Sequence, residues 1–76
     1  MSVTKLPQSQ SNILLDHYQN GRYDDAEKLA ILLTEQFPHD QFSWKVLGAT
    51  LKKKGKVSES LVASQKAVDI NPQDVE

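Results

Sequence analysis

The stretch WKVLGATLKKKGK, from Trp44 to Lys56, decides the fold of this 76-residue chain. Its apolar and small residues recur at the i, i+3, i+4, i+7 spacing of one helix face, namely at Trp44, Leu47, Gly48 and Leu51. Three lysines then occupy the expected last turn, where cations complement the helix dipole. Gly55 follows them and favours the left-handed conformation that ends a helix. The stretch therefore predicts an amphipathic helix with a defined end.

The sequence repeats itself at an interval of 34 residues. The identical pairs that share this interval are Ser9 with Ser43, Gly21 with Gly55, Pro38 with Pro72 and Asp40 with Asp74. Glycine and proline strongly influence where helices end, so their match in one register indicates two copies of a single structural unit.

Each copy is predicted to form two helices joined by a tight turn, so the fold class is all-α with four helices. The expected helices run from about Gln8 to Asn20, from Asp24 to Gln36, from the cap Asp40 to just before Gly55, and from the cap Ser58 to Asn71. Asp24 and Glu27 are spaced like a capping box at the start of the second helix. Pro38 stops that helix near Gln36.

The repeat also sets the expected boundaries. The first unit spans 7–40 and the second spans 41–74, with a flexible N-terminus at 1–6. The segment from Pro72 resembles the one from Pro38, where a new helix opens. Residues 75–76 are therefore interpreted as the start of a third unit or a truncation point, and the sequence as the N-terminal piece of a longer chain.

Composition excludes several classes of function. The net charge of −1 disfavours a dedicated nucleic-acid binder, and the absence of cysteine rules out disulfides and thiolate chemistry. No apolar run approaches the ~20 residues of a membrane span, and no signal peptide is present, so a cytoplasmic protein is expected. His17 and His39 are too isolated to suggest a metal site. No nucleophile elbow or phosphate loop occurs, so neither enzymatic activity nor a cofactor is expected.

The spacing resembles the tetratricopeptide repeat family, whose 34-residue unit carries a W-x2-L-G-x2-Y pattern followed by a small residue, Ala and Pro. The second unit matches at Trp44, Leu47, Gly48, Leu51, Gly55, Ala67 and Pro72, and the first at Ile13, Gly21, Tyr23, Ala26 and Pro38. Four residues depart from the pattern: Gln10, Leu14, Ser60 and Ser64. Leu14 replaces the small residue matched by Gly48 and would widen the helix spacing or repack against Tyr18. Ser60 and Ser64 predict a polar junction beyond the fourth helix.

The resemblance implies two stacked helical hairpins, an α-solenoid fragment whose first helices line a concave groove that binds a peptide segment of a partner protein. The groove candidates are Ser11, Asn12, Leu15, Tyr18, Phe42, Lys45, Ala49, Lys52 and Lys53. Trp44 is expected to pack in the core. Phe42 and Tyr18 are left open between packing and ligand contact.

Other interpretations stay open. The lysines from Lys45 to Lys56 either form a basic rim for an acidic partner or serve as solvated helix ends, the second being favoured for Lys54 and Lys56. The module is alternatively the substrate-recruiting part of a larger bacterial glycosyltransferase or sulfotransferase. Nucleic-acid binding through the lysine cluster is the weakest idea.

The fourth helix carries apolar residues expected to be its buried face: Leu61, Ala67, Val68 and Ile70. Two repeats leave apolar surface at both ends of the array, so Leu61, Val62, Val68 and Ile70 are predicted to lack cover within this chain. The fragment is therefore expected to form a homodimer through these ends.

Overall fold

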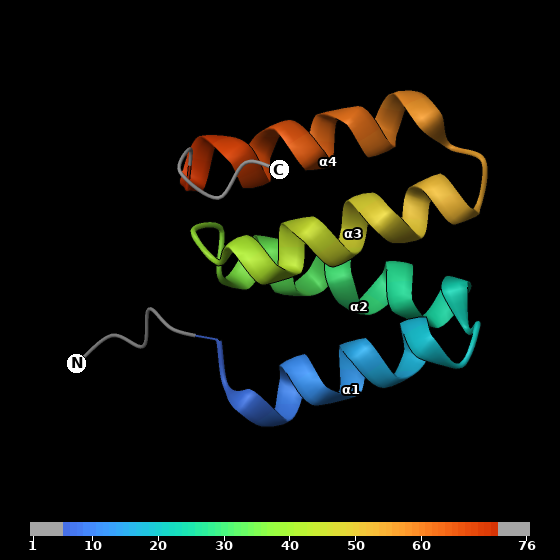
Figure 1. Ribbon diagram of the computed structural model, residues 1–76. Coiled ribbons are helices and arrows are strands. Elements are labelled where there is room, and N and C mark those ends of the chain that lie inside the picture. The colour runs from blue at the N-terminus through green and yellow to red at the C-terminus, as the bar shows by residue number, and fades with distance from the viewer. Residues whose placement is uncertain (1–5, 72–76) are drawn as a thin grey trace.

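The computed structural model describes residues 6–71 and is all-α (Figure 1). Its helices are α1 (Gln8–Gln19), α2 (Tyr23–Gln36), α3 (Gln41–Lys53) and α4 (Val57–Ile70). This confirms the predicted fold class and the predicted four helices. None of the helices in this part of the chain is long and apolar enough to cross a membrane. The expected start of a third unit, at 75–76, lies outside the described residues.

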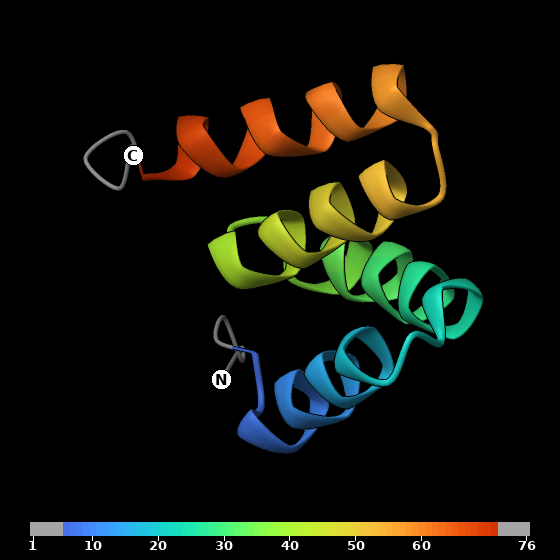
Figure 2. The same ribbon diagram turned by 45° about the vertical axis from the view of Figure 1, so that its right-hand side comes forward.

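The helices stack in chain order, with α1 at one end of the stack and α4 at the other (Figures 1 and 2). Each packs against the next, and α3 also contacts α1, so α3 touches all three other helices. Among the described helices, α4 contacts α3 alone. One long face of α4 is therefore left without a neighbour.

The two hairpin turns have the same geometry, 34 residues apart. Gly21 and Gly55 adopt φ values of +76° and +82°, which glycine accepts without strain. In the first turn the backbone N–H of Arg22 donates to the carbonyl of His17, and in the second that of Lys56 donates to Leu51, both at 2.9 Å. This is the Schellman pattern that satisfies the last carbonyls of a helix. The predicted helix ends are thus confirmed.

The predicted helix starts are wrong for α2 and α4. These helices begin at Tyr23 and Val57, and neither has a side-chain cap, so the Asp24 and Ser58 caps are not formed. The reason is the tight turn, in which the residue after each glycine supplies the first carbonyl of the next helix. The Arg22 carbonyl accepts from the Ala26 N–H, and the Lys56 carbonyl accepts from the Ser60 N–H. Asp40 does cap α3, as predicted.

The two hairpins pack differently inside, and Gly48 is the cause. A Cβ at Gly48 would lie 2.8 Å from the Ser64 Oγ, so α3 and α4 approach closely there. The Ser60 hydroxyl donates to the Gly48 carbonyl at 2.8 Å across the same contact. The prediction that Ser60 and Ser64 form a polar junction beyond the fourth helix is therefore wrong for Ser60, which is buried and bonded to α3. Ser64 lies beside Gly48 but remains exposed. In the first hairpin the buried Leu14 takes the place of Gly48, and α1 and α2 make less extensive contact.

The core runs through all four helices and is built from small and branched aliphatic residues: Leu14, Ala26, Ala30, Leu33, Val46, Leu47, Leu51 and Ala63. Leu6 joins it and is only 8% exposed, so the expectation of a flexible N-terminus at 1–6 is wrong for this residue. The rest of that segment, residues 1–5, lies outside the described part.

On α4, Ala67 is buried as predicted, whereas Leu61 and Val68 are exposed. Their expected burial is wrong because no second helix covers that side. The separate prediction that Leu61, Val62 and Val68 lack cover is confirmed, and Ile70 is half-buried.

Candidate functional site

Two hollows lie between α1 and α3 and together form what we call the α1–α3 groove. The first has a volume of about 300 Å³ and is lined by Leu6, Gln8, Ser11, Asn12, Leu15, Asp40 and Phe42. The second, of about 380 Å³, is lined by Leu15, Tyr18, Phe42, Lys45, Val46 and Ala49. Leu15 and Phe42 line both hollows. The two hollows therefore form one continuous surface around these two apolar side chains.

The groove contains seven of the nine residues predicted for it: Ser11, Asn12, Leu15, Tyr18, Phe42, Lys45 and Ala49. Lys52 and Lys53 are exposed in the last turn of α3 and line neither hollow. Leu6, Asp40 and Val46 also line the groove and were not predicted for it. Asp40 is there because it caps α3, accepting from the Ser43 N–H at 2.9 Å and the Ser43 hydroxyl at 2.8 Å.

The groove has a polar end and an apolar end. The first hollow is rich in amides and hydroxyls, and the Gln8 side-chain amide donates to the Asn12 Oδ1 at 3.0 Å along its wall. The second is lined mostly by apolar side chains, with Lys45 as its cation. Such a surface offers hydrogen-bonding groups at one end and an apolar seat at the other.

The aromatic residues divide between core and groove. Trp44 packs against the core from the other side of α3, and its indole N–H donates to the Pro38 carbonyl at 2.9 Å. Tyr18 and Phe42 also pack partly on the core, and the Tyr18 ring meets the Tyr23 ring edge-on at 5.7 Å. Both residues nevertheless line the groove, so packing holds these two side chains in place where a ligand would meet them.

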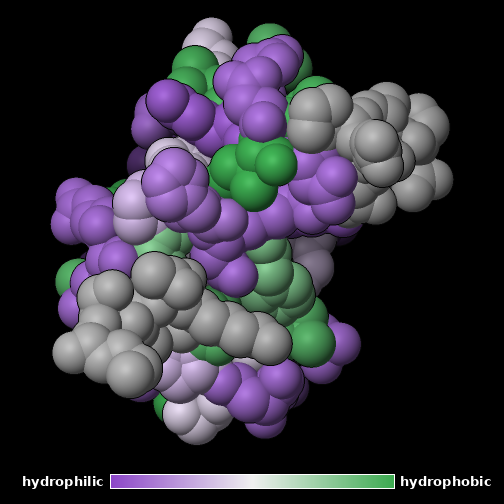
Figure 3. Space-filling model, turned by 90° about the vertical axis from the view of Figure 1, so that its left-hand side faces the viewer, coloured by the Kyte–Doolittle hydropathy of each residue, from purple (hydrophilic) through white to green (hydrophobic). Residues whose placement is uncertain are grey.

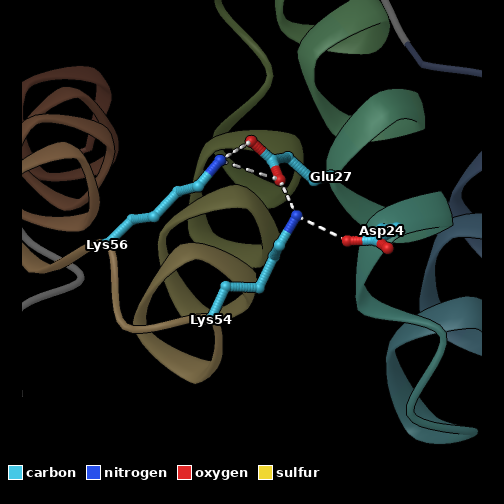
Figure 4. Close-up of polar contacts among 4 residues, drawn as sticks. All are labelled: Asp24, Glu27, Lys54 and Lys56. Carbon is cyan, nitrogen blue, oxygen red and sulfur yellow. Dashed lines mark hydrogen bonds and ion pairs between the residues drawn. The ribbon is translucent and has the colours of Figure 1, made fainter.

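Two of the lysines form an ion-pair cluster between the hairpins (Figure 4). The Lys54 Nζ lies 2.6 Å from an Asp24 carboxylate oxygen and 2.5 Å from the Glu27 Oε1. The Lys56 Nζ lies 3.1 Å from the other Glu27 oxygen. The Glu27 side chain is 13% exposed and that of Asp24 is 81% exposed. Glu27 is therefore the shielded centre of the cluster.

The cluster shifts the ionisation of its members. The hydrogen bond from Lys54 lowers the pKa of Glu27, and Lys56 adds to this effect, against the opposing effect of desolvation. The pKa of Asp24 is also lowered, first by its hydrogen bond from Lys54. The pKa of Lys54 is raised by the two carboxylates, Asp24 first. All three groups are held in their charged forms at neutral pH.

The cluster corrects the interpretation of Lys54 and Lys56 as solvated helix ends. Each bridges to α2, because the start of α2 and the end of α3 lie on the same side of the molecule, at the right of Figure 1. The sequence did contain a signal for this contact, since acidic residues open α2 where lysines close α3. Lys54 and Lys56 therefore belong to the ion-pair cluster and not to the predicted basic rim.

Neither histidine lies in a metal-binding group. His39 is exposed, and the half-buried His17 accepts a hydrogen bond at Nδ1 from the Arg22 Nε at 3.2 Å. Within residues 6–71 no three His, Cys, Asp or Glu side chains come together in a way that would hold a metal ion.

Figure 3 shows the side of the molecule at the left of Figure 1, where hydrophilic residues dominate and apolar ones appear in patches.

No protein-family model matches the chain, and no curated protein matches it significantly.

Proposed function

We propose that this chain is a non-catalytic tetratricopeptide-type module that binds a peptide segment of a partner protein in the α1–α3 groove. The observation that carries the proposal is the continuous surface around Leu15 and Phe42, which two helices of different repeats build together. A surface shared between repeats is long enough to follow an extended segment rather than a single side chain.

The chemistry of the groove supports a peptide as the ligand. Side-chain amides and hydroxyls, such as Asn12 and Ser11, match the hydrogen-bonding groups of an extended backbone. Leu15 and Phe42 offer a seat for one apolar side chain of the peptide. The 34-residue repetition of the turn geometry, with φ near +80° at Gly21 and Gly55, supports the repeat family itself.

Asp40 balances Lys45 within the groove, and the exposed lysines at the end of α3 favour a partner that carries carboxylates. Lys45 lines the apolar hollow, and Lys52 is exposed about two turns further along α3. Lys53 follows it in the same last turn. An acidic peptide that seats its apolar side chain near Leu15 would meet this cationic side, which speeds encounter more than it tightens binding.

The test is selection of peptides from a library of random sequences displayed on phage, followed by affinity measurement with synthetic copies. Leu15→Glu is the diagnostic variant, because Leu15 lines both hollows yet is 37% exposed and its replacement leaves the core intact. We expect selected peptides to bind this variant at least about tenfold more weakly than the wild type. Acidic residues should be enriched next to an apolar anchor.

Leu32→Glu is the matched control, because Leu32 is a 48% exposed leucine of α2 that lines neither hollow. It should bind the selected peptides as the wild type does. Equal binding by the Leu15→Glu variant, or selection that enriches no peptide, would contradict the proposal.

A further inference from the structure

A stripe of residues along α4 has the spacing of a helix-pairing seam. Val57, Leu61, Ser64 and Val68 follow one another at intervals of four, three and four residues, which keeps them on one side of the helix. Leu61 is 66% exposed, Val57 is 59% exposed and Val68 is 37% exposed. α4 contacts no described helix except α3. We call these four residues the α4 seam.

The first repeat shows what such a surface does when it is covered. The α2 residues that lie 34 positions before Leu61, Ser64 and Val68 are Glu27, Ala30 and Thr34. Ala30 and Thr34 are buried, and the Glu27 side chain is contacted by Lys54 from the end of α3. In the repeat geometry this side of a second helix therefore receives another helix, and on α4 its apolar residues Val57, Leu61 and Val68 are exposed.

We propose that the α4 seam pairs with the same seam of a second copy of this chain, in an antiparallel, two-fold symmetric dimer. Val57 then lies opposite Val68 of the second copy, and Leu61 lies opposite its Ser64. The antiparallel arrangement places each large leucine over a small serine, whereas a parallel one sets two serines against each other and leaves a gap. It also sets the helix dipoles in opposition, which is the favourable arrangement.

Stacking of the seam on α1 of another copy is disfavoured by what α1 presents. The α3 residues that correspond to Asp16 and His17 are the buried Thr50 and Leu51. In α1, by contrast, Asp16 is ion-paired with Arg22 at 2.6 Å on an exposed surface. Covering this pair with α4 would remove two charges from water, which costs more than the contact returns. A pairing of α4 with itself avoids that cost and closes the assembly at two copies.

The size of the seam sets the expected strength of the dimer. A helix of 14 residues is about 21 Å long, and one face of it buries on the order of 400 Å² per copy. A total of about 800 Å² lies below the range of stable complexes, so the dimer is expected to be weak and reversible, in the high micromolar range.

Sedimentation equilibrium of the whole chain, from about 10 µM to about 1 mM, tests the proposal across the range in which weak interfaces associate. The wild type should shift from a mass of 8.5 kDa toward twice that value. Leu61→Glu should raise the dissociation constant of the dimer by at least about tenfold, since it places two carboxylates in the seam. Its circular dichroism should match the wild type, because Leu61 is mostly exposed.

Leu32→Glu, which makes the same change at an exposed leucine of α2, is the control and should dimerise as the wild type does. A wild type that stays monomeric at about 1 mM overturns the proposal, and so does an equal effect of the two variants. Because this test does not involve the groove variant Leu15→Glu, its failure would leave the peptide-binding proposal standing.

Single cysteines report the orientation, since the chain has no cysteine of its own. The Val57→Cys and Val68→Cys variants, mixed and oxidised gently, should form the mixed disulfide faster than either forms a disulfide with itself. Faster self-linking of each variant would overturn the antiparallel arrangement.

Discussion

The Glu27 carboxylate in α2 lies 2.5 Å from the Lys54 ammonium at the end of α3, and this contact joins the two helical hairpins. Lys56 approaches the second Glu27 oxygen from the start of α4, at 3.1 Å. A single carboxylate of α2 therefore connects to the end of α3 and to the residue before α4, on one side of the molecule. Because its side chain is only 13% exposed, water screens it less than it screens an ordinary surface ion pair.

The cluster makes stability depend on pH at both extremes. The pKa of Glu27 is lowered on folding, mainly by the hydrogen bond from Lys54, so its contribution is present above its ordinary value of 4.5 and is lost as the pH falls through the folded pKa. Lys54 behaves in the opposite sense, because its pKa is raised: its contribution is full below 10.5 and is lost as the pH rises through the folded value. Thermal unfolding followed from pH 3 to pH 8 should show stability decreasing below about pH 4.5.

The Glu27→Gln variant tests whether Glu27 causes the loss of stability at low pH. We expect it to lower the free energy of unfolding by about 1 kcal/mol at pH 7, or roughly 4–8 °C in Tm, because it removes a charged partner of two lysines. The difference from the wild type should shrink as the pH falls below 4.5. Glu35→Gln, on an exposed position of α2, is the charge-matched control and should leave the profile unchanged. An acid limb as steep in Glu27→Gln as in the wild type would assign the pH dependence to other groups.

Gly48 should tolerate alanine and reject leucine. The Cβ of an alanine would meet the Ser64 Oγ at 2.8 Å, but that hydroxyl ends a short side chain that can rotate away, and the backbone atoms of α4 lie 3.5 Å off. Gly48→Ala should therefore change the free energy of unfolding by less than about 1 kcal/mol, since the gain in helix propensity offsets the strain. Gly48→Leu, which copies Leu14 of the first repeat, should cost about 2–3 kcal/mol by forcing α3 and α4 apart.

Urea unfolding of both Gly48 variants, with Ala49→Leu as a size-matched control at the groove surface, distinguishes the two effects. A Gly48→Leu variant as stable as the wild type would mean that α4 moves out at little cost, in keeping with the less extensive contact between α1 and α2 in the first hairpin. In that case the close approach of α3 and α4 would not be a determinant of stability.

The helix ends were predictable from sequence because the residues that specify them act locally. Gly21 and Gly55 accept the positive φ that ends a helix, and Pro38 ends α2 by restricting the residue before it. The starts of α2 and α4 were not predictable in the same way. There the turn places Arg22 and Lys56 at the N-cap position. Each helix therefore begins before Asp24 or Ser58, although these are better capping residues.

The groove was predicted more fully than the ion-pair cluster, for a physical reason. The resemblance to a repeat family assigns one face of the first helix of each repeat to a groove, so Leu15, Phe42 and Ala49 could be placed there before any contact was known. The pairing of Glu27 with Lys54 depends on where two helix ends meet in space. The role of Ser60, whose hydroxyl reaches the Gly48 carbonyl, depends likewise on a close approach that the repeat pattern does not encode.

Asp40 is expected to be the most important cap of the structure, because the starts of α1, α2 and α4 have no side-chain cap. Asp40→Ala removes the acceptor of the Ser43 N–H and hydroxyl, and we expect a loss of about 1 kcal/mol, or roughly 4–8 °C in Tm. Asp25→Ala removes the same charge from an exposed position in the first turn of α2 and serves as the control. Differential scanning calorimetry that gives both variants the same Tm would show that the cap does not stabilise α3.

Thr50 carries a hydroxyl that the fold does not use. Its side chain is fully buried in α3, and its Oγ1 has no hydrogen-bond partner among the described residues. A buried hydroxyl without a partner retains the cost of leaving water, whereas a methyl group of the same size does not. Thr50→Val should therefore stabilise the fold by about 1 kcal/mol, raising Tm by roughly 4–8 °C. Thr50→Ser is the matched comparison, because it keeps the hydroxyl and deletes the methyl group, and it should destabilise the fold. Urea titrations in which Thr50→Val unfolds earlier than the wild type would mean that the Thr50 hydroxyl has a partner that stabilises α3.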